Sequence, residues 1–149
     1  MPSLRPVALL LLVLLPTACD GLSVESDGPQ LPNTCVPTAD RPHKSKTAAI
    51  KGYDSIVVKA WFNCSVALQD ATLTAEIQRR EGATWTYVDS NPEDFRPVQR
   101  RHKYESIIEI SCVEGSYRGR TRMSAHDSAG TLRESSWYAS DVVTDPCGG

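Results

Sequence analysis

Apolar and polar side chains alternate over ten residues in the middle of the chain, and this period of two constrains the fold more than any other feature. In Ser55–Cys64, one face carries Ile56, Val58, Ala60, Phe62 and Cys64. Such a pattern is typical of a strand that buries one of its faces. Residues 72–80 repeat it, so the sequence predicts at least two strands in succession.

A turn follows the second of these strands. Residues 81–83 contain Gly82, which favours a hairpin loop leading into a strand over residues 84–88. A loop of three residues would place Tyr87 opposite Ile77 and Trp85 opposite Arg79. A two-residue turn at Glu81 and Gly82 would instead oppose Trp85 to Gln78. The first register pairs apolar with apolar side chains and is preferred.

Residues 104–113 and 116–125 are two further strands, separated by Glu114 and Gly115, a strong hairpin signal. In that hairpin Glu109 would lie opposite Arg120. Residues 95–98 are expected to form a short edge strand, because prolines 92 and 97 exclude a central strand in that segment. A last strand over residues 131–143 completes the pattern. No segment has a helical period over three turns.

Six to seven short strands joined by turns predict an all-β fold, an antiparallel β-sandwich. Four cysteines accompany it and allow three connectivities. Cys64 and Cys112 fall on the apolar faces of two strands, where a bridge between sheets must start, so we expect them to pair. By elimination, Cys35 would pair with Cys147. The fold is then disulfide-stapled.

This layout resembles the immunoglobulin-like β-sandwich. In that family a tryptophan follows the first inter-sheet cysteine closely and a tyrosine lies two residues before the second; here Trp85 is farther along and position 110 is Ile. The order of Arg79 and Arg80, Trp85, Cys112 and the run from Gly115 to Arg118 is also similar to small secreted proteins of Gram-positive bacteria with uncharacterised roles. This resemblance covers roughly residues 64–138 and implies a compartment and a fold.

The N-terminus carries an export signal. Arg5 is followed by nine consecutive apolar residues, and the small residues Thr17 and Ala18 come before Cys19. These are the three regions of a signal peptide, here residues 1–18, and the apolar run is too short to span a bilayer.

The five residues that end in Cys19 resemble a bacterial lipoprotein signal, although Pro16 stands where that signal usually has Leu. The resemblance implies that Cys19 becomes the lipid-carrying first residue of the mature chain, with the membrane as a partner through its lipid anchor. Ordinary secretion, with Cys19 left as a thiol, is the alternative.

Residues 19–46 are rich in Pro, Ser and Gly and predict a lipid-anchored tether, while residues 47–149 form the β-sandwich domain. Cys35 lies within the tether and is best explained as a staple onto the domain. Loss of residues 1–18 removes Arg5 and no acid, so the formal charge changes from -2 to -3. This balance gives no indication of a nucleic-acid partner.

Catalytic and metal-binding patterns are weak. The three histidines, His43, His102 and His126, have no metal-ligand spacing, and no Cys-x-x-Cys occurs. His126 and Asp127 beside Ser124 or Ser128 suggest a hydrolase triad, but no serine lies in a Gly-x-Ser-x-Gly turn. We therefore expect no cofactor, no metal and no enzyme activity.

The candidate ligand face is a row of cations on one strand. Arg118, Arg120 and Arg122 share a face, with His126 farther along the same side. Guanidinium groups at strand spacing can bind phosphate or carboxylate groups of an envelope polymer. The alternative is a solvated face whose charge is balanced by Glu105 and Glu109.

Trp61 is a second candidate. It points away from the apolar face of its strand, so the tether or a partner would cover it. The sequence thus predicts an exported binding module. A secreted inhibitor or blocking protein aimed at another protein is one alternative, and a small envelope hydrolase is another.

The signal and the odd number of cysteines predict that Cys19 is acylated. Metabolic labelling with a fatty-acid analogue should mark the exported protein, and Cys19→Ser should abolish the label. Equal labelling of the variant, or no label on the parent protein, would contradict lipidation.

Overall fold

The computed structural model describes residues 34–127 and 129–148. The predicted signal peptide, Cys19 and the first part of the tether lie outside these residues. The described strands are β1 Cys35–Ala39, β2 His43–Lys44, β3 Ser55–Cys64, β4 Ala71–Glu81, β5 Thr84–Phe95, β6 Tyr104–Ser111, β7 Ser116–His126, β8 Leu132–Glu134, β9 Tyr138–Ala139 and β10 Val143–Thr144. One short helix, α1 Lys46–Ile50, follows β2.

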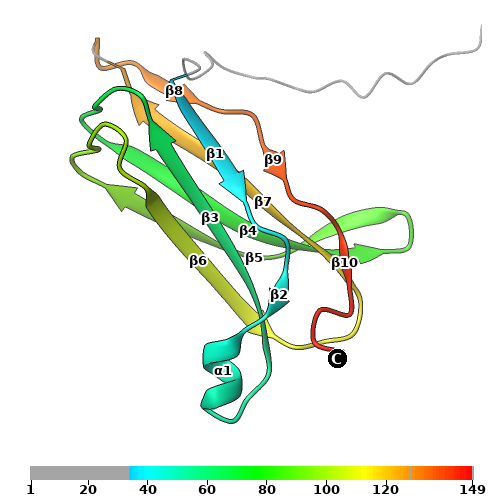
Figure 1. The fold of residues 1–149 in the computed structure, drawn as a ribbon. Helices are drawn as coiled ribbons and strands as arrows, with labels where there is room; N and C mark the ends of the chain where they lie inside the picture. The colour runs from blue at the N-terminus through cyan, green and yellow to red at the C-terminus, as the bar shows by residue number, and fades with distance from the viewer. Residues whose placement is uncertain (1–33, 128, 149) are drawn as a thin grey trace, which may run out of the picture.

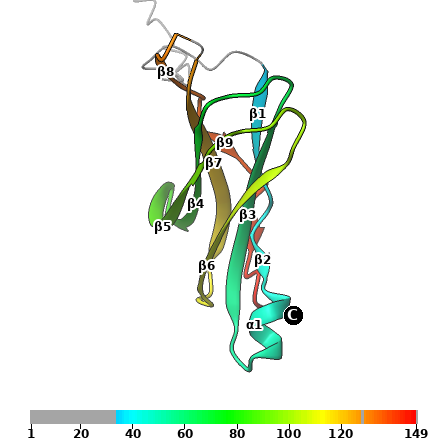
Figure 2. The ribbon, with the colours of Figure 1, turned by 90° about the vertical axis from the view of Figure 1, so that its left-hand side faces the viewer.

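The strands form two antiparallel sheets that pack face to face as two layers (Figures 1 and 2). In the first sheet, which we call sheet B, β3 lies between β6 and the consecutive short strands β1 and β2. In sheet A, β4 and β7 are central, β5 is one edge, and β8, β9 and β10 together form the other. The predicted all-β, antiparallel sandwich is confirmed.

The core lies between the two sheets and contains the residues that alternate inward. β3 contributes Ile56, Val58, Ala60 and Phe62, and β4 contributes Leu73, Ala75 and Ile77. These side chains are all buried, so the inward phase predicted for both strands is confirmed. An aromatic cluster of Phe62, Phe95 and Tyr104 closes one end of the core.

The predicted hairpin between β6 and β7 is wrong. β6 pairs with β3 in sheet B, and β7 pairs with β4 in sheet A, so the intervening residues cross between the layers. Tyr117 stabilises this crossing, because its buried ring lies in the core and its hydroxyl donates to the carbonyl of Val113 over 2.8 Å. This contact resembles the tyrosine corner of immunoglobulin-like sandwiches. It occurs at the start of β7, not two residues before Cys112.

The disulfide pairing predicted from the inward phase is also wrong. Cys35 bonds Cys64, and Cys112 bonds Cys147. Since β3 and β6 are antiparallel, with Ser55 opposite Ser111, Cys64 and Cys112 lie at opposite ends of the pair, roughly 30 Å apart along the strand direction. Cys35 is instead the direct cross-strand neighbour of Cys64 in β1. Two disulfides nevertheless fit an oxidising compartment.

The turn between β4 and β5 has two residues, Gly82 and Ala83, so the preferred three-residue loop is wrong, and so is the alternative turn at Glu81 and Gly82. Glu81 pairs with Thr84 across Gly82 and Ala83, which places Trp85 opposite Arg80. The same register places Tyr87 opposite Gln78, and a bulge between Ile77 and Gln78 then shifts the pairing so that Ile77 lies opposite Asp89. Gly82 has a φ of 62°, which a two-residue hairpin turn requires and glycine adopts at little cost. β5 runs through Pro92, as an edge strand permits.

The folded domain begins earlier than position 47. β1 and β2 lie within residues predicted as tether, and both pair with β3. Pro37 and Pro42 are fully buried, so proline content here marks an edge strand rather than a flexible segment.

The last predicted strand, residues 131–143, is interrupted twice. At the breaks, serine hydroxyls replace backbone groups: the amides of Met123 and Gly119 donate to the side chains of Ser135 and Ser140, both over 2.9 Å. The edge of β7 therefore stays hydrogen-bonded across the gaps between the three antiparallel strands β8, β9 and β10. Within the described residues, no helix is long and apolar enough to cross a membrane.

Gly119 of β7 packs closely against sheet B. A Cβ there would lie 2.7 Å from Cγ1 of Val58 and 2.8 Å from the carbonyl oxygen of Asp40. We predict that Gly119→Ala lowers the free energy of unfolding by roughly 1–3 kcal/mol, measured by denaturant titration. Gly148→Ala, whose Cβ would meet only ordinary contacts, should change it by less than about 0.5 kcal/mol. Equal denaturation midpoints for the two variants would contradict this, and would mean that the sheets can move apart at Gly119 at little cost.

Candidate functional site

The three arginines of the candidate ligand face project from the outer face of sheet A. β7 alternates along its length, with Tyr117, Gly119, Thr121 and Met123 buried and Arg118, Arg120 and Arg122 partly exposed. The prediction that these arginines share one face is confirmed. The opposite face of the strand belongs to the core.

Two tryptophans stack on this row. The ring of Trp85, from β5, lies 4.5 Å from the guanidinium carbon of Arg118. Trp137, between β8 and β9, lies 4.2 Å from that of Arg120 and 5.0 Å from that of Arg122. We call these five residues the arginine–tryptophan stack. The interruption after β8 places Trp137 over β7, where a continuous strand would have paired instead.

Polar partners for the stack come from sheet A itself. The Nε of Arg118 donates to Oε1 of Gln78 over 2.8 Å, on the neighbouring strand β4. Arg120 Nε lies 3.7 Å from Oε1 of Glu76, and Arg122 Nη1 lies 3.9 Å from Oε2 of Glu134. The alternative in which Glu105 and Glu109 balance the row is wrong, because both belong to β6 in the other sheet.

The ion pair between Glu76 and Arg120, at the centre of the row, is largely buried and has a long contact distance. The side chain of Glu76 is only 11% exposed and that of Arg120 21%. At 3.7 Å their contact is longer than a hydrogen bond, and the buried Nε of Arg120 has no hydrogen-bond partner in the described residues. The pair is therefore held by charge and by the stacking of Trp137 rather than by a bidentate bond.

The row keeps a net positive charge. Arg120 and Arg122 each face one carboxylate, but Arg118 makes no ion pair within the described part of the chain. Burial is the main cause that lowers the pKa of the Arg118 guanidinium, and the adjacent charge of Arg120 lowers it further while Glu76 opposes both. An arginine nonetheless stays protonated in proteins. Lowered pKa and missing counter-ion both indicate that Arg118 would gain from a bound anion.

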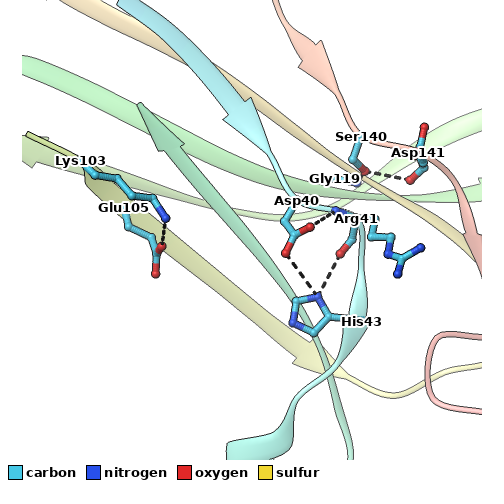
Figure 3. A network of polar contacts seen from close by, with 8 residues as sticks. All are labelled: Asp40, Arg41, His43, Lys103, Glu105, Gly119, Ser140 and Asp141. Atoms are coloured by element: carbon cyan, nitrogen blue, oxygen red, sulfur yellow. Dashed lines mark hydrogen bonds and ion pairs between the residues drawn. The ribbon is translucent and has the colours of Figure 1, made fainter. Parts of the chain in front are cut away.

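Trp61 does not belong to this face. It lies on the outer face of sheet B, where Lys103 Nζ is 4.6 Å from its ring. The same Nζ is 3.0 Å from Oε2 of Glu105 (Figure 3). The candidate face predicted from the sequence is thus divided between opposite sides of the sandwich.

His126 ends β7 on the same side as the arginines but has a partner of its own. Its Nδ1 lies 2.8 Å from Oδ1 of Asp70, whose other oxygen is 3.9 Å from Nε of Arg96. The hydrogen bond with His126 is the main cause that lowers the pKa of Asp70, although burial opposes it. His126 is therefore bound to Asp70, the residue just before β4, rather than free for a ligand of the row.

The histidine and acid needed for a hydrolase triad are paired, but with Asp70 in place of Asp127. Ser124 makes no hydrogen bond with His126, and Ser128 lies outside the described residues. No group of three or more His, Cys, Asp or Glu side chains that could hold a metal occurs in residues 34–127 and 129–148. The hydrolase alternative stays a prediction without an assembled site.

No protein-family model, curated protein or solved structure matches the chain. The function is therefore inferred from the sequence and structure of this chain alone.

Stacking on Trp137 should couple that residue to Arg122 energetically. In a double-mutant cycle with Arg122→Gln and Trp137→Leu, we expect an interaction free energy of about 0.5–2 kcal/mol from unfolding measurements. Arg133→Gln is a matched control, since Arg133 pairs with Asp127, whereas Arg120 and Arg122 are the arginines that stack on Trp137 in the described residues. The effect of Arg133→Gln should add to that of Trp137→Leu. If the effects of Arg122→Gln and Trp137→Leu were also additive, stacking of Arg122 on Trp137 would contribute nothing to stability.

Proposed function

We propose that the protein is an exported, lipid-anchored and non-catalytic binding module, and that the arginine–tryptophan stack binds a polymer with repeated anionic groups. One observation carries the proposal: three guanidinium groups are fixed on one strand, and Arg118 among them has no carboxylate partner in the described residues. The ligand class is a polymer that carries phosphate or carboxylate groups.

Stacking supports binding because it orders the cations in advance. An arginine side chain free in water loses considerable rotamer entropy when it binds an anion. Here indole rings cover guanidinium faces, while Gln78 and Glu76 lie at the Nε of Arg118 and Arg120. The terminal nitrogens of Arg118 accordingly remain for a ligand, and they are the atoms that bind phosphate and carboxylate oxygens bidentately.

The spacing of the row favours a repeating ligand. Residues two apart on a strand lie about 6.8 Å from one another, so Arg118 and Arg122 lie about 13.5 Å apart. A single small anion cannot contact both ends, whereas a chain of regularly spaced anions can. This argument selects a polymer over a free ion.

Export is supported separately. The signal over residues 1–18 and Cys19 predict delivery to the cell surface, and two disulfides among the described residues suit that compartment. A module anchored there would meet envelope polymers directly.

The test uses the full chain and two anionic polymers, a polyglycerol phosphate and a polygalacturonate, with neutral dextran as a reference. Arg118→Gln with Arg122→Gln should weaken binding of the anionic polymer by about tenfold, because two charge-assisted contacts are lost. It should also lower the free energy of unfolding by about 1–2 kcal/mol, since both side chains stack on tryptophan. Binding should weaken as salt rises past about 0.1 M, where screening acts within about 10 Å.

The matched control is Arg100→Gln with Arg101→Gln, which removes the same charge from an exposed loop before β6. It should leave the affinity within about twofold. Equal weakening by both double variants would reduce the row to part of a diffuse field and contradict the proposal. Affinity that does not change with salt would exclude the electrostatic mechanism.

A further inference from the structure

A groove lies on the outer face of sheet B, on the opposite side of the sandwich from the arginine–tryptophan stack. Its volume is about 430 Å³, within the range of small-molecule sites. Eight residues from β2, α1, β3 and β6 line it or flank it: His43, Ser45, Lys46, Thr47, Val57, Lys59, Ile107 and Glu109. It shares no residue with the proposed polymer site.

The register of sheet B builds the groove. His43, Val57 and Glu109 lie in one row across β2, β3 and β6, and Lys59 and Ile107 lie in the next. α1 forms the wall beside this face (Figure 1), fixed by the side chain of Ser45, which accepts from the amide of Ala48 over 3.2 Å. Ser45 and Ala48 are buried, so this wall is part of the folded domain.

The two lysines of the groove lack partners. Neither Lys46 nor Lys59 makes an ion pair or a side-chain hydrogen bond within the described residues, whereas Lys44 is paired with Asp54 and Lys103 with Glu105. Of the carboxylate oxygens of Glu109, one accepts from the hydroxyl of Ser55. The groove thus holds more unpaired positive than negative charge.

His43 is oriented by the loop before it. Its Nδ1 lies 3.0 Å from the carbonyl oxygen of Arg41, which can only accept, so Nδ1 carries the proton (Figure 3). Asp40 lies on the same side, 3.9 Å away. The other ring nitrogen, Nε2, is then left for a ligand or solvent.

The floor of the groove is apolar. Val57 faces outward from sheet B, outside the core cluster, and is nevertheless only 6% exposed. Ile107 beside it is 46% exposed and extends this apolar surface. An apolar floor beside two ammonium groups complements a molecule with one anionic end and one branched apolar group.

We propose that this groove binds a carboxylate carried on a short, branched apolar group, with the carboxylate at Lys46 and Lys59 and the apolar group on Val57 and Ile107. That chemistry occurs at the C-terminus of a peptide and in a short-chain branched acid. The volume accommodates either.

The experiment titrates the full chain with two carboxylates, N-acetyl-alanyl-valine and 4-methylpentanoate, and follows backbone amide shifts by NMR. We expect saturable shifts at Val57, Lys59 and Ile107. Lys46→Gln with Lys59→Gln should weaken binding by about tenfold. The same peptide with a C-terminal amide should bind about tenfold more weakly than the free carboxylate, because the amide carries no negative charge.

The matched control is Lys44→Gln with Lys51→Gln, which removes two lysines of the same segment that do not line the groove. Its affinity should stay within about twofold. Ile107→Ser, an exposed position that the fold tolerates, should weaken both carboxylates and leave inorganic phosphate unchanged.

Saturable binding of either carboxylate at the groove supports the proposal, and the tighter of the two identifies the source. Shifts that are absent, that persist with the peptide amide, or that resist the Lys46 and Lys59 change would overturn it. Phosphate binding as tight as that of the carboxylates, together with no effect of Ile107→Ser, would also overturn it, because the apolar floor would then play no part. None of these outcomes depends on the polymer site of sheet A.

Discussion

The pairing of β7 with β4 is the interaction on which the rest of the structure depends. One side of β7 closes the core with Tyr117 and Met123, and the other side carries the arginines. Because the pairing is antiparallel and in register from Ala71 to Arg79, it places Gln78 and Glu76 next to Arg118 and Arg120. A shift by one residue would turn the arginines into the core and the apolar side chains into water. Core burial therefore fixes the geometry of the cationic row.

Local phase was predictable from the sequence, but long-range pairing was not. The inward residues of β3 and β4 follow from alternation within each strand, which depends only on neighbours along the chain. Whether Gly115 joins two strands of one sheet or crosses between sheets depends on contacts far away, such as that of β6 with β3. The wrong disulfide pairing has the same origin, since inward phase does not reveal at which end of the sandwich a cysteine lies.

In the candidate site, too, local alternation was predictable from the sequence and long-range contacts were not. Alternation places Arg118, Arg120 and Arg122 on one face, as the structure has them. Their stacking partners could not be found this way, because Trp137 reaches them only through the interruption between β8 and β9, where Ser135 maintains the hydrogen bonding. The groove on sheet B could not be predicted from the sequence for a similar reason. Its wall is α1, a helix of five residues that is too short to give a periodic signal.

The bridge between Cys35 and Cys64 has a mechanical consequence. Cys35 is the first residue of β1, and Cys64 is the last of β3. A pull on the chain ahead of Cys35 would pass through the sulfur atoms into the end of β3, so residues between the two cysteines would carry no tension. β2 and α1, which border the groove, would therefore keep their shape under such a pull. With the proposed N-terminal anchor, this covalent shortcut would isolate the proposed carboxylate groove from mechanical load.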